Sequence, residues 1–231
     1  MKKIGLVGGL SWVSTAEYYR LLNQMTRDVL GGHHSAPILL ESLNEQEFLS
    51  LQSEDLTEHK CEQMIVSAVQ RLLGGGAEVI ALCANGIHRF ASSIEHQCQV
   101  ELIHIAKVTA CEVSKKHLSR VGLLGVLKTM EGTFYPQVLN QHDIEVLIPE
   151  KEDRLCVHDL IISELVFGNF TDRARSILVE ICSRLHHQGA QGVILGCTEI
   201  PLLMQSVESL PVPLFSTTDL HCRAIVEAAL L

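Results

Sequence analysis

One segment of the chain decides the predicted fold, residues 189–199, which read GAQGVILGCTE. Residues 76–86, GAEVIALCANG, repeat its pattern of a Gly-Ala turn, a buried apolar strand and a loop of small polar residues. A duplicated unit that ends in a cysteine predicts two half-sites facing each other, as required when one group removes a proton and an opposite group delivers one. Matched without gaps, however, Cys197 falls opposite Ala84 and not opposite Cys83.

Strands alternate with amphipathic helices along both halves of the chain. The strands are near-continuous runs of Val, Ile and Leu, which is typical of a parallel sheet covered by helices on both faces. The pattern predicts strands at 3–7, 37–43, 78–82, 120–125 and 144–148, and helices around 18–25 and at 62–73, 154–166 and 172–187. The predicted fold class is therefore α/β.

The two halves repeat the same order of elements at similar length, which predicts two pseudo-symmetric lobes, each a mainly parallel sheet flanked by helices. We expect the first lobe to comprise residues 1–106 and 212–231, and the second lobe to comprise residues 107–211. A last strand at 211–216 and a final helix at 218–231 would return the chain to the first lobe. Since open α/β sheets bind ligands at the carboxyl ends of their strands, we expect an active-site cleft between the lobes.

Composition argues against several classes of protein. The 231 residues carry a net charge of −9 and a pI near 5.7, and no basic run is longer than a Lys-Lys pair, so nucleic acid is not an expected partner. No segment approaches the roughly 20 apolar residues of a membrane span, and the N-terminal run reads as a first strand rather than a signal peptide. Eight cysteines without a C-x-x-C pair argue against a disulfide framework or structural zinc and favour a reducing cytoplasm.

Cys197 is the leading candidate for a catalytic residue. It follows a buried strand and precedes an apparent helix, whose first N–H groups would stabilise a thiolate and lower the pKa of the thiol from its free value of ~8.5. The simpler alternative is a buried cysteine that acts as a small hydrophobic residue. Its place at the end of a strand, beside Thr198 and Glu199 and within the repeat, favours the catalytic interpretation.

Several motifs resemble those of the aspartate/glutamate racemases. Residues 8–19, GGLSWVSTAEYY, are similar to the opening G-G-M-S-W-E-S-T-x-x-Y-Y of that family. Residues 196–203, GCTEIPLL, resemble its second catalytic loop, and residues 82–88, LCANGIH, look like a variant of the first. Residues 31–36 and 164–170 also resemble family stretches, so the likeness extends over essentially the whole chain.

This resemblance implies a racemase that needs no cofactor and uses two thiols on opposite faces of the substrate α-carbon. Without pyridoxal phosphate as an electron sink, the site itself must stabilise the carbanionic transition state. The family's first catalytic position immediately precedes Asn-Thr, but here Ala84 precedes Asn85 and Gly86, while Cys197 stands in the second loop. Cys83 can substitute only if the loop rearranges, because adjacent side chains on an extended chain point to opposite faces.

Polar residues near the two loops are the candidate substrate ligands. By resemblance, Asn85, Thr198 and the N–H groups around Ser11 bind the α-carboxylate, and such amides commonly form anion sites. The alternative for Asn85 is a turn residue that bonds its own backbone. Gln52 and Asn169 occupy regions where relatives recognise the side-chain carboxylate, and the loop residues Gly86 and Glu199 complete the predicted substrate-binding set.

Histidines are the remaining candidates. His88 and His221 either orient groups near the cleft or are structural histidines with satisfied hydrogen bonds. The adjacent pairs His33-His34 and His186-His187 do not present two rings to one ion, and no Cys, Asp or Glu partner has suitable spacing. The sequence therefore predicts no metal site.

Three functions fit these residues. The first is an amino-acid racemase acting on aspartate or glutamate, or a close relative with low or altered activity, with Cys197 as one acid/base and Ala84 marking the deficient face. The second is a single-cysteine carbanion enzyme, like the decarboxylases of the same superfamily, in which only one face is protonated. The third is a protein that binds an acidic amino acid without turning it over, which the changes at Ala84 and Gly86 favour. Relatives commonly dimerise, so a homodimer is expected.

Overall fold

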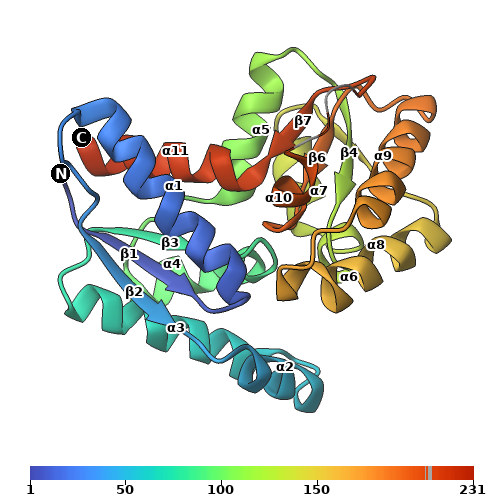
Figure 1. The fold of residues 1–231 in the computed structure, drawn as a ribbon. Helices are drawn as coiled ribbons and strands as arrows, with labels where there is room; N and C mark the ends of the chain where they lie inside the picture. The colour runs from blue at the N-terminus through green and yellow to red at the C-terminus, as the bar shows by residue number, and fades with distance from the viewer. Residues whose placement is uncertain (206, 208–209) are drawn as a thin grey trace. The chain divides into compact units, whose positions relative to one another are not determined.

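The computed structural model describes residues 1–205, 207 and 210–231, and it contains two parallel β-sheets flanked by helices (Figure 1). The strands are β1 (Ile4–Gly8), β2 (Ile38–Ser42), β3 (Val79–Leu82), β4 (Arg120–Leu124), β5 (Glu145–Leu147), β6 (Val193–Leu195) and β7 (Leu214–Ser216). The α-helices are α1 (Trp12–Leu30), α2 (Glu45–Glu54), α3 (His59–Gly74), α4 (Ala91–Cys98), α5 (Ile105–Lys115), α6 (Leu127–Met130), α7 (Phe134–Asn140), α8 (Lys151–Ser163), α9 (Asp172–His187), α10 (Ile200–Met204) and α11 (Thr217–Leu230). Two 3₁₀ helices, η1 (Gly86–Phe90) and η2 (Leu165–Phe167), complete the described elements, and the α/β class is confirmed.

In the first sheet, β1 lies between β2 and β3 and pairs with both in parallel. One face of this sheet, with Ile4 and Leu6, packs on α1 and α11, and the opposite face, with Val7, packs on α3 (Figure 1). Every residue of β1 and β3 is buried as a result. These strands therefore read as continuous apolar runs and not as alternating ones.

Local capping explains where the helices begin and end. Ser11 is the N-cap of α1, and its Oγ accepts a hydrogen bond from the Ser14 backbone N–H over 3.5 Å, which satisfies one of the free N–H groups at the helix start. The helix ends at Gly31, whose φ of 74° lies in the left-handed region that glycine tolerates. Asn44 and Thr171 cap α2 and α9 in the same way as Ser11.

The second sheet repeats the topology of the first. Its strands pair in parallel in the order β5-β4-β6-β7, so that β5-β4-β6 corresponds to β2-β1-β3. The counterpart of β7 in the first sheet is the residue Leu102, which forms an isolated parallel bridge with Ile80 of β3. The pseudo-symmetric lobes predicted from the sequence are therefore confirmed as two units of equivalent topology.

The boundaries of the units differ from the predicted ones. The chain divides into one unit of Met1–His104 with His221–Leu231 and a second unit of Ile105–Leu220. The sequence placed 212–231 in the first lobe, but β7 pairs with β6, so residues 212–220 belong to the second unit. The reason is that a short apolar strand carries no local mark of the sheet to which it will pair.

Candidate functional site

The second loop, residues 196–199, follows β6 and leads into α10. Cys197 keeps some exposed surface, whereas Thr198 and Glu199 are buried. The Cys197 thiol donates a hydrogen bond to Glu199 Oε2 over 2.9 Å, and the Thr198 hydroxyl donates to the same oxygen over 3.0 Å. Three predicted site residues therefore form one hydrogen-bonded group around a carboxylate that is only 2% exposed.

The pKa of the Cys197 thiol lies well above its ordinary value, so the predicted lowering was wrong. Burial contributes most, and the negative charge of Glu199 and the hydrogen bond to it raise the pKa further. The backbone N–H groups of Glu199 and Ile200 do lower the pKa, as expected of a helix start, but their effect is smaller. The resting thiol is therefore protonated and donates to the carboxylate.

Glu199 is better placed to accept a hydrogen bond from Cys197 than to bind an acidic substrate. A buried carboxylate repels the carboxylates of aspartate or glutamate, and the Thr198 O–H, which could have bound a substrate carboxylate, is directed at Glu199 instead. The substrate-binding role expected of Glu199 stays a prediction, and its observed partners are the thiol and the hydroxyl. This pairing was not predicted from the sequence, because residues 197 and 199 meet only where the loop turns.

The first loop, residues 83–86, follows β3 and leads into η1. Cys83 is 1% exposed and packs in the core with α1 and α11, and burial raises the pKa of its thiol above the ordinary value. Ala84 lies on the opposite face and packs against the core that includes α3. Adjacent side chains therefore alternate here as on an extended chain. The Cys83 thiol would reach a substrate only after the loop had rearranged.

The faces of the sheets on which the loop residues pack show which residue of the first loop corresponds to Cys197, and the answer agrees with the ungapped sequence repeat. Ala84 shares its face of the first sheet with Leu82, and Cys197 shares its face of the second sheet with Leu195. Cys83 packs on the other face of its sheet. By this criterion Ala84, and not Cys83, is the counterpart of Cys197.

Ser11 and Asn85 follow β1 and β3, so they lie at the same edge of the first sheet. The first loop is tied to the start of α1, because Ser14 Oγ donates to the Cys83 carbonyl oxygen over 2.8 Å. Asn85 is 4% exposed and makes no side-chain capping bond to η1, so it is not a simple helix cap. Both residues stay candidates for binding a substrate carboxylate.

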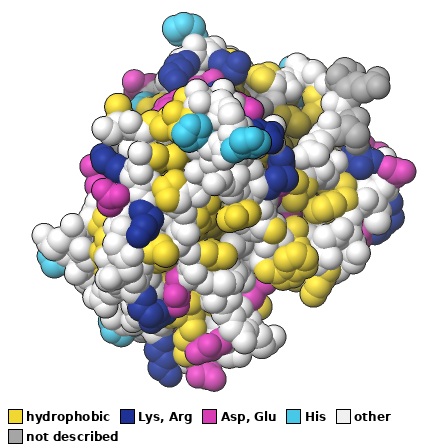
Figure 2. Space-filling model, turned by 60° about the vertical axis from the view of Figure 1, so that its left-hand side comes forward, with side chains coloured by type: hydrophobic (Ala, Val, Ile, Leu, Met, Phe, Trp, Pro, Cys, Tyr) yellow, Lys and Arg dark blue, Asp and Glu magenta, His cyan; other side chains and the backbone are white. Residues whose placement is uncertain are grey.

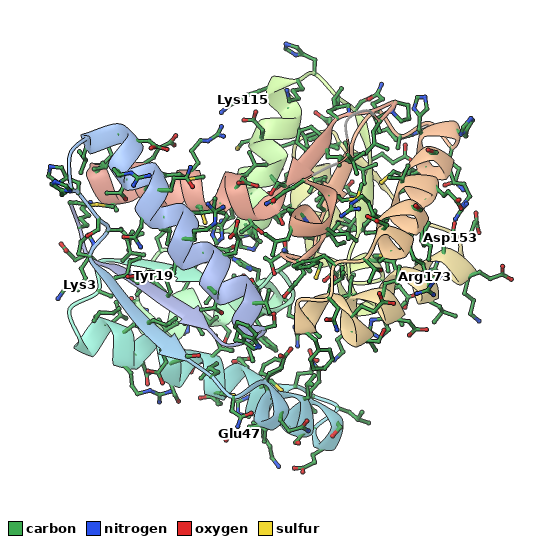
Figure 3. The ribbon with its side chains drawn as sticks, in the orientation of Figure 1. Lys3, Tyr19, Glu47, Lys115, Asp153 and Arg173 are labelled. Carbon is green, nitrogen blue, oxygen red and sulfur yellow. The ribbon has the colours of Figure 1, made fainter. Side chains whose placement is uncertain are left out.

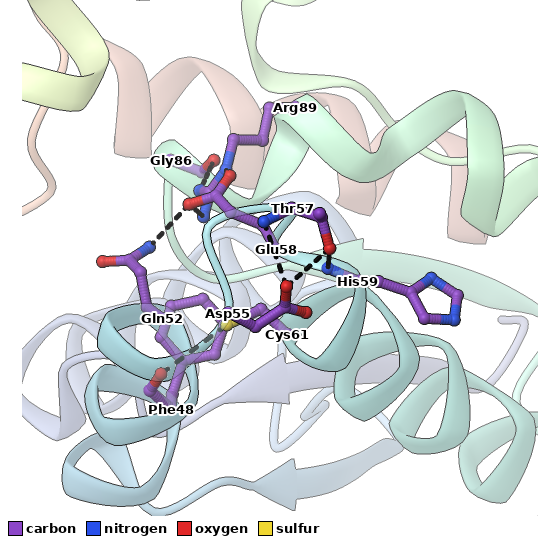
Figure 4. Close-up of polar contacts among 9 residues, drawn as sticks. All are labelled: Phe48, Gln52, Asp55, Thr57, Glu58, His59, Cys61, Gly86 and Arg89. Carbon is purple, nitrogen blue, oxygen red and sulfur yellow. Dashed lines mark hydrogen bonds and ion pairs between the residues drawn. The ribbon is translucent and has the colours of Figure 1, made fainter.

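Gln52 and Gly86 are connected through an ion pair that the sequence did not single out (Figure 4). Arg89 donates from Nε to Glu58 Oε2 over 2.7 Å and from Nη2 to Oε1 over 3.0 Å. Gln52 donates to the same carboxylate over 3.1 Å, and Arg89 also donates to the Gly86 carbonyl oxygen. These contacts brace the first loop against the segment that joins α2 to α3. No local pattern pairs Glu58 with Arg89, because they are 31 residues apart.

Asn169 lies on an exposed turn of the second unit, after η2. Its backbone N–H donates to the Glu164 carbonyl oxygen over 3.1 Å, and Gly168, with φ of 76°, lets the chain reverse there. Phe167 and Phe170 beside it are also exposed. The proposed role of Asn169 in recognising a side-chain carboxylate stays a prediction.

A surface cavity of about 730 Å³ lies beside the carboxyl-terminal half of α1. It is lined by Tyr19, which projects from α1 with 56% exposure (Figure 3), and by the segment with His33 and His34. None of the predicted catalytic or substrate-binding residues lines it. Within residues 1–205, 207 and 210–231, no group of three or more His, Cys, Asp or Glu side chains is arranged to hold a metal ion.

The described surface gives two further observations. On the face drawn in Figure 2, Lys and Arg side chains are interspersed with Asp and Glu, so this face offers no continuous basic track for a phosphate backbone. In the part of the chain that the structure describes, no helix combines the length and apolar character needed to cross a membrane.

The family follows from the sequence profile that matches the chain. The profile of the Asp/Glu/hydantoin racemases matches residues 7–225. The chain belongs to this family. The match includes both loops. Membership of this family therefore supports the assignment of the protein as an isomerase of the racemase type that acts on small amino-acid substrates.

Solved structures agree with this assignment. The chain is 40% identical to a candidate Asp/Glu racemase from Yersinia pestis, with 100% of each chain covered and a TM-score of 0.91. It is 30% identical to an aspartate racemase homologue from Pyrococcus horikoshii OT3, again with 100% of each chain covered and a TM-score of 0.85. An unliganded arylmalonate decarboxylase, 14% identical with 99% of this chain and 93% of that chain covered, has a TM-score of 0.54 and shares the fold alone.

Proposed function

We propose that this racemase-family protein is a cofactor-independent racemase of aspartate or glutamate in which Cys197 is the acid/base for one face of the α-carbon. The observation that carries this proposal is the 2.9 Å hydrogen bond from the Cys197 thiol to Glu199 Oε2. A nucleophile or base with a proton acceptor already in contact can be activated without help from solvent. Membership of the racemase family supports the class of substrate.

Proton abstraction then takes two transfers. Glu199 Oε2 accepts the Cys197 proton, and the thiolate takes the α-proton, so that an S–H bond forms as the C–H bond breaks. The electron pair of the C–H bond passes into the α-carboxylate, which needs hydrogen-bond donors to stabilise the new charge. For that carboxylate we keep Ser11, Asn85 and Thr198 as proposed ligands, and the single O–H of Thr198 has to turn from Glu199 Oε2 to the substrate when the substrate binds.

Inversion needs an acid/base on each face of the α-carbon, and here the two faces are unequal. Ala84, the counterpart of Cys197, has a methyl group that carries no exchangeable proton. The neighbouring Cys83 thiol is buried, and its raised pKa disfavours the thiolate. We therefore propose that proton exchange on the Cys197 face is faster than racemisation.

A carbanion enzyme that works on one face is the second candidate. The burial of Cys83 behind Ala84 favours it, because a single thiol protonates a carbanion from one side and retains one configuration. Such an enzyme would suit the decarboxylation of a substrate with two carboxylates on one carbon. An acidic-amino-acid binding protein without turnover is the remaining alternative.

Incubation with L- and D-aspartate and L- and D-glutamate in D₂O separates these functions. The α-proton exchange is followed by NMR, and the configuration by circular dichroism. Exchange with slower loss of optical rotation supports the racemase, and exchange with full retention supports the single-face enzyme. If ligands raise the melting temperature of the protein and no α-proton exchanges, the racemase proposal is overturned in favour of the binding protein.

We further expect a homodimer that resides in a reducing cytoplasm, with no cofactor. Light scattering coupled to size-exclusion chromatography measures the mass of the particle directly. A mass of one chain at micromolar concentration would contradict the expected dimer.

A further inference from the structure

We propose that His88 is a positioning residue that fixes the first loop by donating a hydrogen bond from Nδ1 to the Ala84 carbonyl oxygen. The inference rests on the proposed function, in which this loop carries Asn85 as a ligand of the substrate carboxylate. Nothing in the family assignment depends on His88. The inference starts from a buried histidine that the proposed proton transfers do not use.

The contact at Ala84 determines which ring nitrogen of His88 carries the proton. Nδ1 lies 2.9 Å from the Ala84 carbonyl oxygen, and a carbonyl oxygen only accepts, so Nδ1 is the protonated nitrogen. Burial, followed by the neighbouring His221 and His104, holds the pKa of His88 well below its ordinary value, so the ring is neutral. The second nitrogen, Nε2, is then a bare acceptor, and it is buried without a hydrogen-bond partner among the described residues.

A second histidine fixes the orientation of the His88 ring. His221 Nε2 lies 2.5 Å from the Ile103 carbonyl oxygen, so Nε2 carries its proton, and His221 Nδ1 accepts from the Tyr18 hydroxyl over 2.8 Å. The ring centroids of His88 and His221 are 5.4 Å apart in an edge-to-face arrangement. The ring centroid of His104 lies 5.0 Å from that of His88 in a tilted arrangement. Both ring nitrogens of His221 are hydrogen-bonded, so its ring is held in place and restricts the orientation of the His88 ring that packs against it.

The first loop is thus held by its carbonyl groups. Ser14 binds the carbonyl of Cys83 over 2.8 Å and the His88 ring binds that of Ala84 over 2.9 Å. The backbone N–H of His88 donates to the carbonyl of Asn85 over 3.1 Å. Three successive carbonyls are engaged, which sets the direction in which the Asn85 side chain leaves the chain. A phenyl ring is similar in size and has no bare Nε2 to bury, so the Nδ1–H bond is the property that only the imidazole supplies.

Two amide substitutions distinguish this role from simple packing. In His88→Asn the amide nitrogen falls where Nδ1 stood and keeps the bond to Ala84, whereas in His88→Gln it falls near the position of Nε2 and loses the bond. We expect kcat/KM for α-proton exchange to fall about 10²-fold in His88→Gln and His88→Phe, since small displacements of positioning groups have effects of that size. In His88→Asn it should stay within about threefold of wild type.

A measurement without turnover separates this inference from the proposed function. Amide hydrogen exchange of the segment 83–90 should accelerate in His88→Gln and His88→Phe and stay slow in His88→Asn. If wild type turns over no acidic amino acid but this exchange pattern holds, the proposed function fails and the role of His88 stands. If His88→Asn and His88→Gln exchange alike, the role of His88 is overturned.

The wild-type protein provides a test that needs no variant. In a ¹H–¹⁵N correlation spectrum of the imidazole groups, His88 should show a protonated Nδ1 and a bare Nε2. A protonated Nε2 would overturn the inference even if every substitution at position 88 prevented folding.

Discussion

The loops after β3 and β6 occupy equivalent places in two units of the same topology, yet they differ in chemistry. The loop after β6 presents the Cys197 thiol bonded to Glu199. The loop after β3 presents the methyl group of Ala84 and keeps the Cys83 thiol in the core. A duplicated framework therefore does not require duplicated chemistry. Core packing fixes the register of the strands, whereas the residues that follow them are free to change.

Of the substitutions in the two loops, Cys197→Ala should have the largest effect on the rate of α-proton exchange. Without the thiol neither loop carries an acid/base in the equivalent position, so α-proton exchange should fall by at least about 10³-fold. NMR in D₂O measures the rate. Cys182→Ala is the matched control, because that thiol belongs to the same core cluster but is not bonded to Glu199. Exchange that survives in Cys197→Ala would remove Cys197 from the mechanism.

Replacing Ala84 by Cys should make the two loops more alike. A thiol at this position would serve the deficient face, so we expect the rate of racemisation, measured by circular dichroism, to rise about 10²-fold. Ala84→Ser is the control of similar size, because a hydroxyl is a poor acid/base near neutral pH. An equal rate in both variants would show that the geometry of the first loop, and not only its missing thiol, limits inversion.

Replacing Glu199 by Gln should shift the pH dependence of the second loop. Burial and then the carboxylate raise the pKa of the Cys197 thiol, so removal of the carboxylate should lower that pKa and move the rising limb of kcat/KM to lower pH. The maximal rate should fall, because the proposed acceptor of the Cys197 proton is gone. Glu131→Gln, which breaks an ion pair with Arg154 elsewhere in the second unit, should leave the limb in place. An unmoved limb in Glu199→Gln would argue that the limb does not report on Cys197.

Replacing Cys83 by Ala should have the smallest effect on activity. We expect exchange within about threefold of wild type, and a loss of roughly 1 kcal/mol in the free energy of unfolding from the buried space left behind. Because burial raises the pKa of this thiol in the folded protein, the unfolded chain releases the proton first once the pH passes about 8.5. Wild type should therefore lose stability above that pH more steeply than Cys83→Ala in urea titrations. A large loss of activity would mean that Cys83 reaches the substrate after all.

Most of the fold was predictable from the sequence, because buried parallel strands are continuous apolar runs and their helices are amphipathic. The strand β7 was assigned to the wrong lobe, since its partner β6 is not a local property of the chain. The second loop was predicted from its cysteine, but the direction of the Cys197 pKa shift depends on the burial of the thiol and then on how Glu199 folds back to it, and neither is a local property of the sequence. The ion pair of Glu58 with Arg89 was missed because it joins distant parts of the chain.

The route of the chain through α11 has a consequence for synthesis on the ribosome. The core of the first unit is completed by side chains of α11 such as Cys222 and Val226, and the Lys2 backbone N–H donates to the Ala229 carbonyl oxygen over 2.7 Å. The second unit, Ile105–Leu220, is continuous in sequence and ends within the first turn of α11, so its own core is complete before the rest of α11 is translated. The unit begun first is therefore finished last, and until then the nascent chain exposes the apolar side of β1 and β3 to aggregation and to chaperones.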